Sequence, residues 1–158
     1  MIKIVSGDIN AGKTSWMLQQ YQKDQKGDGF LSVKTFSREF HTGYDLLHLK
    51  SGKKCPFIRK VTHLEPDWQQ SFVLADFFSF DKRGFEFAQK IVDTAILQRR
   101  APFYFDEVGP LELKGKGFSD IFRKLVLARM DLIVAIRFFL VEDVKKTFSL
   151  NEIEIVNL

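Results

Sequence analysis

Eight residues near the amino terminus have the types and spacing that hold a polyphosphate. Residues 7–14 read Gly-Asp-Ile-Asn-Ala-Gly-Lys-Thr and match G-x-x-x-x-G-K-[ST] at every fixed position. Gly7 and Gly12 let the backbone wrap around a phosphate with N–H groups pointing inward. Lys13 offers a mobile charge to the β- and γ-phosphates, and the Thr14 hydroxyl is a ligand for Mg²⁺. We therefore predict a nucleoside triphosphate site formed by Gly7, Asp8, Ile9, Asn10, Ala11, Gly12, Lys13, Thr14 and Ser15.

A pair of acidic residues is the second chemical signal. Phe-Tyr-Phe at 103–105 predicts a short buried strand, and Asp106 and Glu107 follow at its carboxyl end. A phosphate-bound Mg²⁺ needs a carboxylate at the end of a neighbouring strand to hold its water, which predicts Asp106 as a metal residue together with Thr14. Glu107 is predicted to polarise an attacking water as general base. Glu107 and Lys13 are thus the expected catalytic residues.

The segments on either side of the loop are expected to position it. Residues 2–5 are mostly apolar and β-branched, which predicts a buried strand that ends at the loop. Apolar residues at helical spacing then predict a helix over residues 13–24. The positive end of that helix would face the phosphates.

Residues 29–75 change to a β pattern. Glycine- and proline-containing turn signals separate four short strand-like runs, at 30–33, 44–47, 57–61 and 71–74. We interpret this segment as an antiparallel β-meander inserted into a chain that otherwise alternates between strands and helices.

The alternation resumes after the insert. Asp81 is a candidate N-cap for a helix that ends near residue 100, and its apolar residues recur at i, i+3, i+4, i+7 and i+8. The remaining patterns predict helices at 119–129 and 141–146 and strands at 132–136 and 152–156. Buried strands alternating with helices predict an α/β fold with a mostly parallel sheet. With the phosphate loop, this is the three-layer P-loop NTPase fold.

Composition restricts the functional classes. A length of 158 residues suits a single domain spanning residues 1–158, and one cysteine excludes an internal disulfide framework. The most apolar stretch is broken by Arg129, Asp131 and Arg137, so no membrane span is expected. The first residues lack the features of an export signal, and we expect a cytoplasmic protein. The net charge of +4 suits an anionic ligand such as a polyphosphate.

Two other groups of residues are given structural interpretations. His41, His48, Cys55 and His63 match no zinc spacing. The basic residues between 50 and 60 lie near Phe57, as on a nucleic-acid surface, but solvated strand faces use the same residues, and we favour that interpretation.

Residues 106–114, Asp-Glu-Val-Gly-Pro-Leu-Glu-Leu-Lys, closely resemble the D-E-[IV]-G-[PK]-[ML]-E signature of the THEP-type, or cancer-related, nucleoside-triphosphatases. Gly43-Tyr44-Asp45 is similar to that family's G-[FY]-D strand, and Phe118 follows the signature as in the family. The resemblance implies a small P-loop enzyme that slowly hydrolyses ATP and GTP in a Mg²⁺-dependent reaction. It also implies little base selectivity and use of the glutamate, here Glu107. The sequence lacks the base-reading motif N-K-x-D, which agrees with loose base selection.

Two alternatives stay open. A nucleotide or small-molecule kinase would have the same phosphate cradle, but it needs a pocket for the acceptor. A nucleotide-regulated accessory module would use the bound nucleotide to shape the β-insert for a protein partner. Any of six arginines, at 83, 99, 100, 123, 129 and 137, could supply charge to the transition state, and sequence does not choose among them.

Overall fold

In the computed structural model, which describes all 158 residues, nine strands form one sheet in the order β5-β6-β4-β3-β2-β7-β8-β1-β9. The parallel half consists of β1 (Ile2–Gly7), β7 (Phe103–Asp106), β8 (Leu132–Arg137) and β9 (Ile153–Asn157). Almost every residue of β1, β7 and β8 is buried, as their mostly apolar sequences predict. Strand β8 lies between β1 and β7, so the end of β8 separates the phosphate loop from the two acids.

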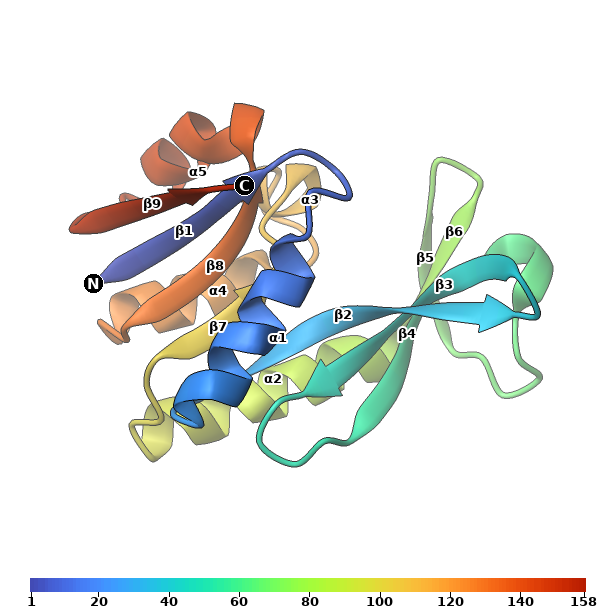
Figure 1. The fold of residues 1–158 in the computed structure, drawn as a ribbon. Helices are drawn as coiled ribbons and strands as arrows, with labels where there is room; N and C mark the ends of the chain where they lie inside the picture. Colours follow the sequence, from blue (N-terminus) through green and yellow to red (C-terminus); the bar gives the residue numbers. More distant parts are fainter.

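Helices cover both faces of the parallel half, which gives the three layers expected from the sequence (Figure 1). α1 (Lys13–Asp24) packs on one face of the sheet, where its Met17 belongs to the same buried cluster as Leu31 of the sheet. The opposite face carries the larger core and the other helices, α2 (Lys82–Leu97), α3 (Pro110–Leu113), α4 (Ser119–Leu127) and α5 (Val141–Thr147). Two 3₁₀ helices, η1 (Val61–His63) and η2 (Phe138–Leu140), complete the chain.

The inserted strands extend this same sheet. They are β2 (Asp28–Ser37), β3 (Phe40–His48), β4 (Lys54–Lys60), β5 (Gln70–Leu74) and β6 (Phe78–Asp81). β2 belongs to both halves of the sheet. Its residues 28–30 pair in parallel with β7, and its residues 30–37 pair antiparallel with β3. β6 was not expected from the sequence. It pairs with β4 and leaves β5 as the edge strand, so the antiparallel region continues to Asp81.

Phenylalanine side chains hold the insert against the rest of the molecule. The ring of Phe57, in β4, stacks 5.1 Å from the ring of Phe118, just before α4. Phe118 also contacts Phe30 and Phe105, in β2 and β7, at centroid distances of 5.2 and 5.9 Å. Aromatic pairs at such distances add about 0.5–1.5 kcal/mol each beyond the area they bury. The many phenylalanines thus fix the insert relative to the carboxyl ends of the parallel strands.

The two ends of helix α2 illustrate local signals. Asp81 caps α2 as expected, since its carboxylate accepts a hydrogen bond from the Arg83 amide at 2.8 Å. The helix ends at Leu97, a few residues before the expected position, and Arg99 adopts a left-handed conformation with φ of 51°.

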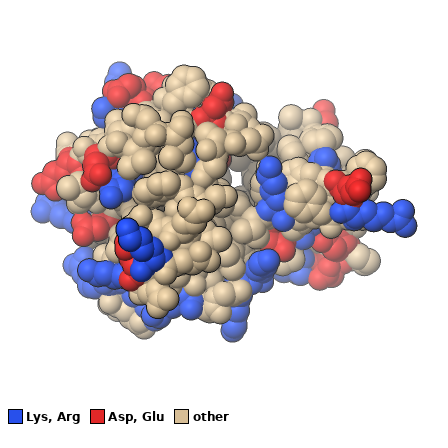
Figure 2. All heavy atoms as spheres, viewed as in Figure 1, with Lys and Arg blue, Asp and Glu red and all other residues tan.

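The surface carries charges of both signs, and in Figure 2 the Lys and Arg side chains do not merge into one basic surface on the face shown. The same view shows a hollow where the insert leaves the parallel half. Helix length and hydropathy identify no segment of the structure able to cross a bilayer as a helix.

Candidate active site

The phosphate loop connects β1 to α1 as the sequence predicted. Gly12 has φ of 93°, in the left-handed region that favours glycine, and the Trp16 amide makes the first helical bond to its carbonyl at 2.9 Å. A Cβ on Gly7 would lie 2.9 Å from the Cβ of Ala11, so only glycine permits this close turn. Backbone amides at the start of α1 therefore face the region that the loop encloses.

Lys13 lies within the loop, and only 8% of its surface is exposed. Its Nζ donates hydrogen bonds to the carbonyl oxygens of Gly7 at 3.1 Å and Asp8 at 2.6 Å. The ammonium group is thus held where a phosphate would contact it. Gly7 is buried and Thr14 is half-buried, whereas Ile9, Asn10 and Ala11 at the tip of the loop and Ser15 on the first turn of α1 are exposed.

The side chains of Thr14 and Asp106 meet at the carboxyl ends of the parallel strands. The Thr14 hydroxyl donates to Oδ2 of Asp106 at 2.8 Å, and the backbone amide of Ser32 donates to the same oxygen at 3.1 Å. Burial raises the pKa of Asp106 to about 6, the nearby Glu107 adds to this, and the hydrogen bonds and Lys13 act in the opposite direction. Because burial outweighs these favourable contacts, a cation beside Asp106 would stabilise its ionised form.

The oxygen donors at this position suit Mg²⁺. One hydroxyl and one carboxylate lie together, and no cluster of three or more His, Cys, Asp or Glu side chains could hold a metal by itself. Mg²⁺ in nucleotide sites usually takes one or two protein ligands and completes its shell with phosphate oxygens and water. Thr14 and Asp106 fit that pattern.

Glu107 follows β7 and forms an ion pair with Arg137, the last residue of β8. The Arg137 Nε donates to Oε1 of Glu107 at 3.0 Å, and about a third of each side chain is exposed. Arg137 is also the register partner of Gly7. Its guanidinium therefore extends from the strand that separates the phosphate loop from Glu107.

The structure separates the arginines that sequence left equal by the partners they contact. Arg83 pairs with Asp81 and Asp67, and Arg100 pairs with Asp28, all within the scaffold. Arg99 donates a hydrogen bond to the backbone carbonyl of Ala128. The guanidinium of Arg123 lies over the ring of Phe148. Arg137 alone of the six contacts a predicted catalytic residue.

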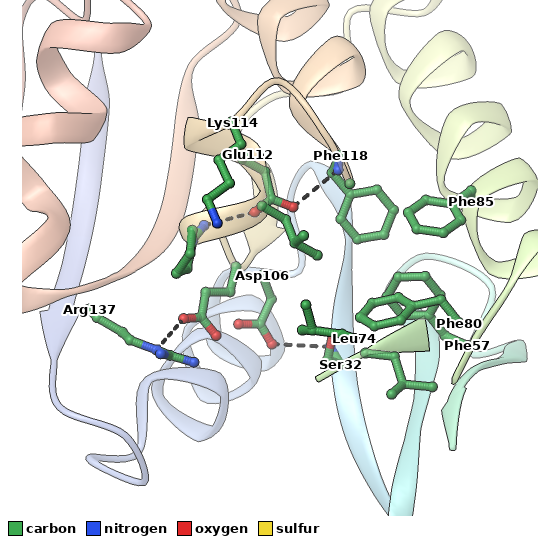
Figure 3. A pocket seen from close by; sticks show the side chains of 16 residues that line it. Ser32, Phe57, Leu74, Phe80, Phe85, Asp106, Glu112, Lys114, Phe118 and Arg137 are labelled. Atoms are coloured by element: carbon green, nitrogen blue, oxygen red, sulfur yellow. Dashed lines mark hydrogen bonds and ion pairs between the residues drawn. The ribbon is translucent and has the colours of Figure 1, made fainter. Parts of the chain in front are cut away.

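Glu112 fixes the segment after the acids. Its side chain is buried, and its two carboxylate oxygens accept hydrogen bonds from the backbone amides of Gly109 at 3.0 Å and Phe118 at 3.1 Å. Burial raises the pKa of this carboxyl despite the two hydrogen bonds. The segment between residues 109 and 118 is thus tied into a fixed wall beside Glu107 (Figure 3).

The insert contributes residues that sequence reasoning missed. Besides the Ser32 amide, Lys34 of β2 donates to the Asn10 side chain in the phosphate loop at 3.2 Å. Tyr44 of β3 lies near enough that the charges of Glu107 and Asp106 add to the effect of burial in raising its pKa. These contacts depend on how β2 and β3 lie beside β7, and no local pattern indicates them. The histidines and Cys55 form no shared site.

A phosphate loop facing an acidic strand end across a three-layer sheet defines the class of P-loop nucleoside-triphosphatases. The chain belongs to the NTPase family, whose model matches residues 3–158. No curated protein matches it.

Two solved structures share the fold. THEP1 from the hyperthermophile Aquifex aeolicus is 22% identical with a TM-score of 0.70, over 100% of this chain and 90% of that one. A human cancer-related nucleoside triphosphatase is 19% identical with a TM-score of 0.65, over 98% and 87%. The resemblance inferred from residues 106–114 is thereby confirmed.

Proposed function

We propose that this nucleoside-triphosphatase hydrolyses ATP and GTP to the diphosphate and inorganic phosphate, slowly, with Mg²⁺ and with little base selectivity. The observation that carries the proposal is the convergence of three groups at one end of the sheet. Lys13 lies in the phosphate loop, Asp106 accepts a hydrogen bond from Thr14, and Glu107 directly follows Asp106 at the end of β7.

Each side chain has a separate task in this reaction. The loop amides and Lys13 bind the β- and γ-phosphates. Thr14 and Asp106 hold Mg²⁺, which, when bound, offsets the phosphate charge. Glu107 accepts a proton from a water as the water oxygen bonds to the γ-phosphorus and the bond to the bridging oxygen breaks.

The ion pair between Arg137 and Glu107 supports slow turnover. A transition-state arginine increases the rate of such reactions by roughly 10³–10⁵. Here the guanidinium charge is already offset by the Glu107 carboxylate, so little of it is available to the γ-phosphate. The same contact orients the carboxylate that must take the proton.

The test is phosphate release from ATP and from GTP, each with Mg²⁺ and no other acceptor. Glu107→Gln keeps the size of the side chain but removes the base, and we expect at least a tenfold loss of turnover with nucleotide binding retained. Unchanged turnover in this variant would exclude Glu107 as the base. Chelation of Mg²⁺ with EDTA should abolish the reaction.

The binding claim has a test of its own. Lys13→Ala removes the ammonium group held by Gly7 and Asp8, and we expect tight triphosphate binding to be lost in equilibrium dialysis. Tight binding by this variant would contradict the assignment of the loop. Lys23→Ala, on the exposed last turn of α1, is the matched control.

A further inference from the structure

A cavity of about 310 Å³ adjoins the candidate active site on the side away from the phosphate loop. Asp106, Glu107 and Arg137 line its inner end, and none of residues 7–15 takes part in its wall. The two carboxylates therefore stand between the phosphate loop and the cavity. A nucleophile held in the cavity would lie beside Glu107, the proposed base.

One side of the cavity is aromatic and aliphatic, while Ser32, Glu112 and Lys114 add polar groups elsewhere in its wall. Figure 3 shows the rings of Phe57, Phe80, Phe85 and Phe118 together with Leu74 on the side opposite Asp106 and Arg137. Water takes up about 30 Å³ per molecule in the liquid, so the cavity has about ten times the volume that a hydrolytic water needs. Apolar walls with a few polar groups at one end are typical of pockets for organic ligands.

A second hollow of about 750 Å³ adjoins the cavity. The two share Leu74, Phe85, Leu111 and Gly117. The outer hollow runs along the edge strand β5, and Lys82 and Lys116 lie beside it. Neither hollow is lined by residues 7–15, so the cavity adjoins Glu107 on a side that the phosphate loop does not cover.

Charge decides which end of a ligand faces inward. Glu112 and Lys114 add one charge of each sign to the cavity wall. At the inner end are the two carboxylates of Asp106 and Glu107 and one guanidinium, which is already paired with Glu107. An anionic group would be repelled there, whereas a neutral hydroxyl can donate to a carboxylate. The phenylalanine wall requires a ring next to that hydroxyl.

We propose that the cavity binds a neutral aromatic alcohol whose hydroxyl replaces water as acceptor of the γ-phosphoryl group. The hydroxyl oxygen bonds to the γ-phosphorus, and its proton passes to the Glu107 carboxylate. The bond from phosphorus to the β–γ bridging oxygen breaks, and the electron pair leaves with the nucleoside diphosphate. The products are an aryl-alkyl phosphate and the diphosphate. This inference rests on the proposed function, since it uses the same loop, metal site and base.

The probe is 4-fluorobenzyl alcohol, which has one ring and one hydroxymethyl group. Its ¹⁹F line should broaden when the protein is added, with or without nucleotide. We expect at least a fivefold loss of broadening in Leu74→Trp and in Leu111→Trp, which place an indole at residues that line both hollows. Leu127→Trp, exposed on α4, is the control that keeps it. Thermal unfolding shows which variants are folded, and either folded blocking variant suffices.

The second measurement follows the label from γ-³²P-ATP with Mg²⁺. We expect labelled 4-fluorobenzyl phosphate beside inorganic phosphate, and none from 4-fluorotoluene, which lacks the hydroxyl. A ¹⁹F line that the protein does not broaden, or broadening equal in the folded blocking variants, would overturn the site. Broadening without labelled ester would overturn the acceptor role. The ¹⁹F measurement needs no turnover, so failure of ATP hydrolysis and failure of the cavity are seen separately.

Discussion

The guanidinium of Arg137 donates a hydrogen bond to the carboxylate of Glu107 at 3.0 Å, across the ends of two adjacent parallel strands. The partners are 30 residues apart in sequence, and the sheet brings them together. The pair connects the residue expected to activate water with the strand next to the phosphate loop.

Replacing Arg137 should slow hydrolysis. In Arg137→Ala the Glu107 carboxylate loses the partner that orients it, and we expect turnover of ATP to fall at least tenfold. Arg137→Lys keeps the charge but loses the Nε contact, so an intermediate loss is expected. Steady-state phosphate release gives both values. Arg129→Ala, on an exposed turn, should retain full turnover, and a wild-type rate in Arg137→Ala would show that the ion pair is dispensable.

The buried Asp106 should make metal-free protein less stable at higher pH. Its folded pKa of about 6 lies above the ordinary value of 3.8, so between these values the folded state holds a proton that the unfolded chain has lost. This carboxyl's contribution to the free energy of unfolding therefore falls as pH rises through 6, by a total on the order of 3 kcal/mol.

Asp106→Asn should remove that loss. With EDTA present, we expect it to be more stable than wild type by about 1–3 kcal/mol at pH 8 and not at pH 4, in urea unfolding. Asp76→Asn, on an exposed turn, should show no such pH-dependent gain. An equal effect of Asp106→Asn at both pH values would contradict the raised pKa.

Glu112 should matter mainly for stability. Glu112→Gln keeps one acceptor oxygen but turns an NH₂ group toward an amide that needs an acceptor, so we expect a loss of about 1–3 kcal/mol in the free energy of unfolding. Glu142→Gln, on the exposed first turn of α5, should change it by less than about 0.5 kcal/mol. Chemical denaturation measures both, and equal effects would show that the buried hydrogen bonds add nothing.

Gly84 lies where α2 approaches β4 closely. An exposed helical glycine replaced by alanine gains about 1 kcal/mol from helix propensity. Here the new Cβ would lie 2.2 Å from Cδ1 of Phe57, and overpacking of this kind costs about 1–3 kcal/mol or more. We expect Gly84→Ala to be less stable by about 1–2 kcal/mol in thermal or urea unfolding. Gln89→Ala, exposed on the same helix, should be neutral, and a stabilised Gly84→Ala would show that Phe57 moves freely.

Local sequence was enough to predict a feature wherever neighbouring residues alone produce that feature. The phosphate loop needs glycine at two positions and a helix directly after it, and neighbouring residues supply both. The Asp81 cap is also a contact between near neighbours in the chain. Strand β6 escaped prediction because its place depends on pairing with β4 as well as β5, and no local pattern connects it to the distant β4.

The sequence by itself determined the phosphate loop, the acids after the aromatic strand and the alternation that makes a three-layer fold. Tertiary structure decided which residues from distant parts of the chain contact the phosphate loop and the two acids. Arg137 faces Glu107 because β8 lies between β1 and β7, and Lys34 reaches Asn10 because β2 pairs beside β7. Strand order is set by how buried faces pack over the whole chain, so contacts such as Thr14 with Asp106, 92 residues apart, follow only from the complete sheet.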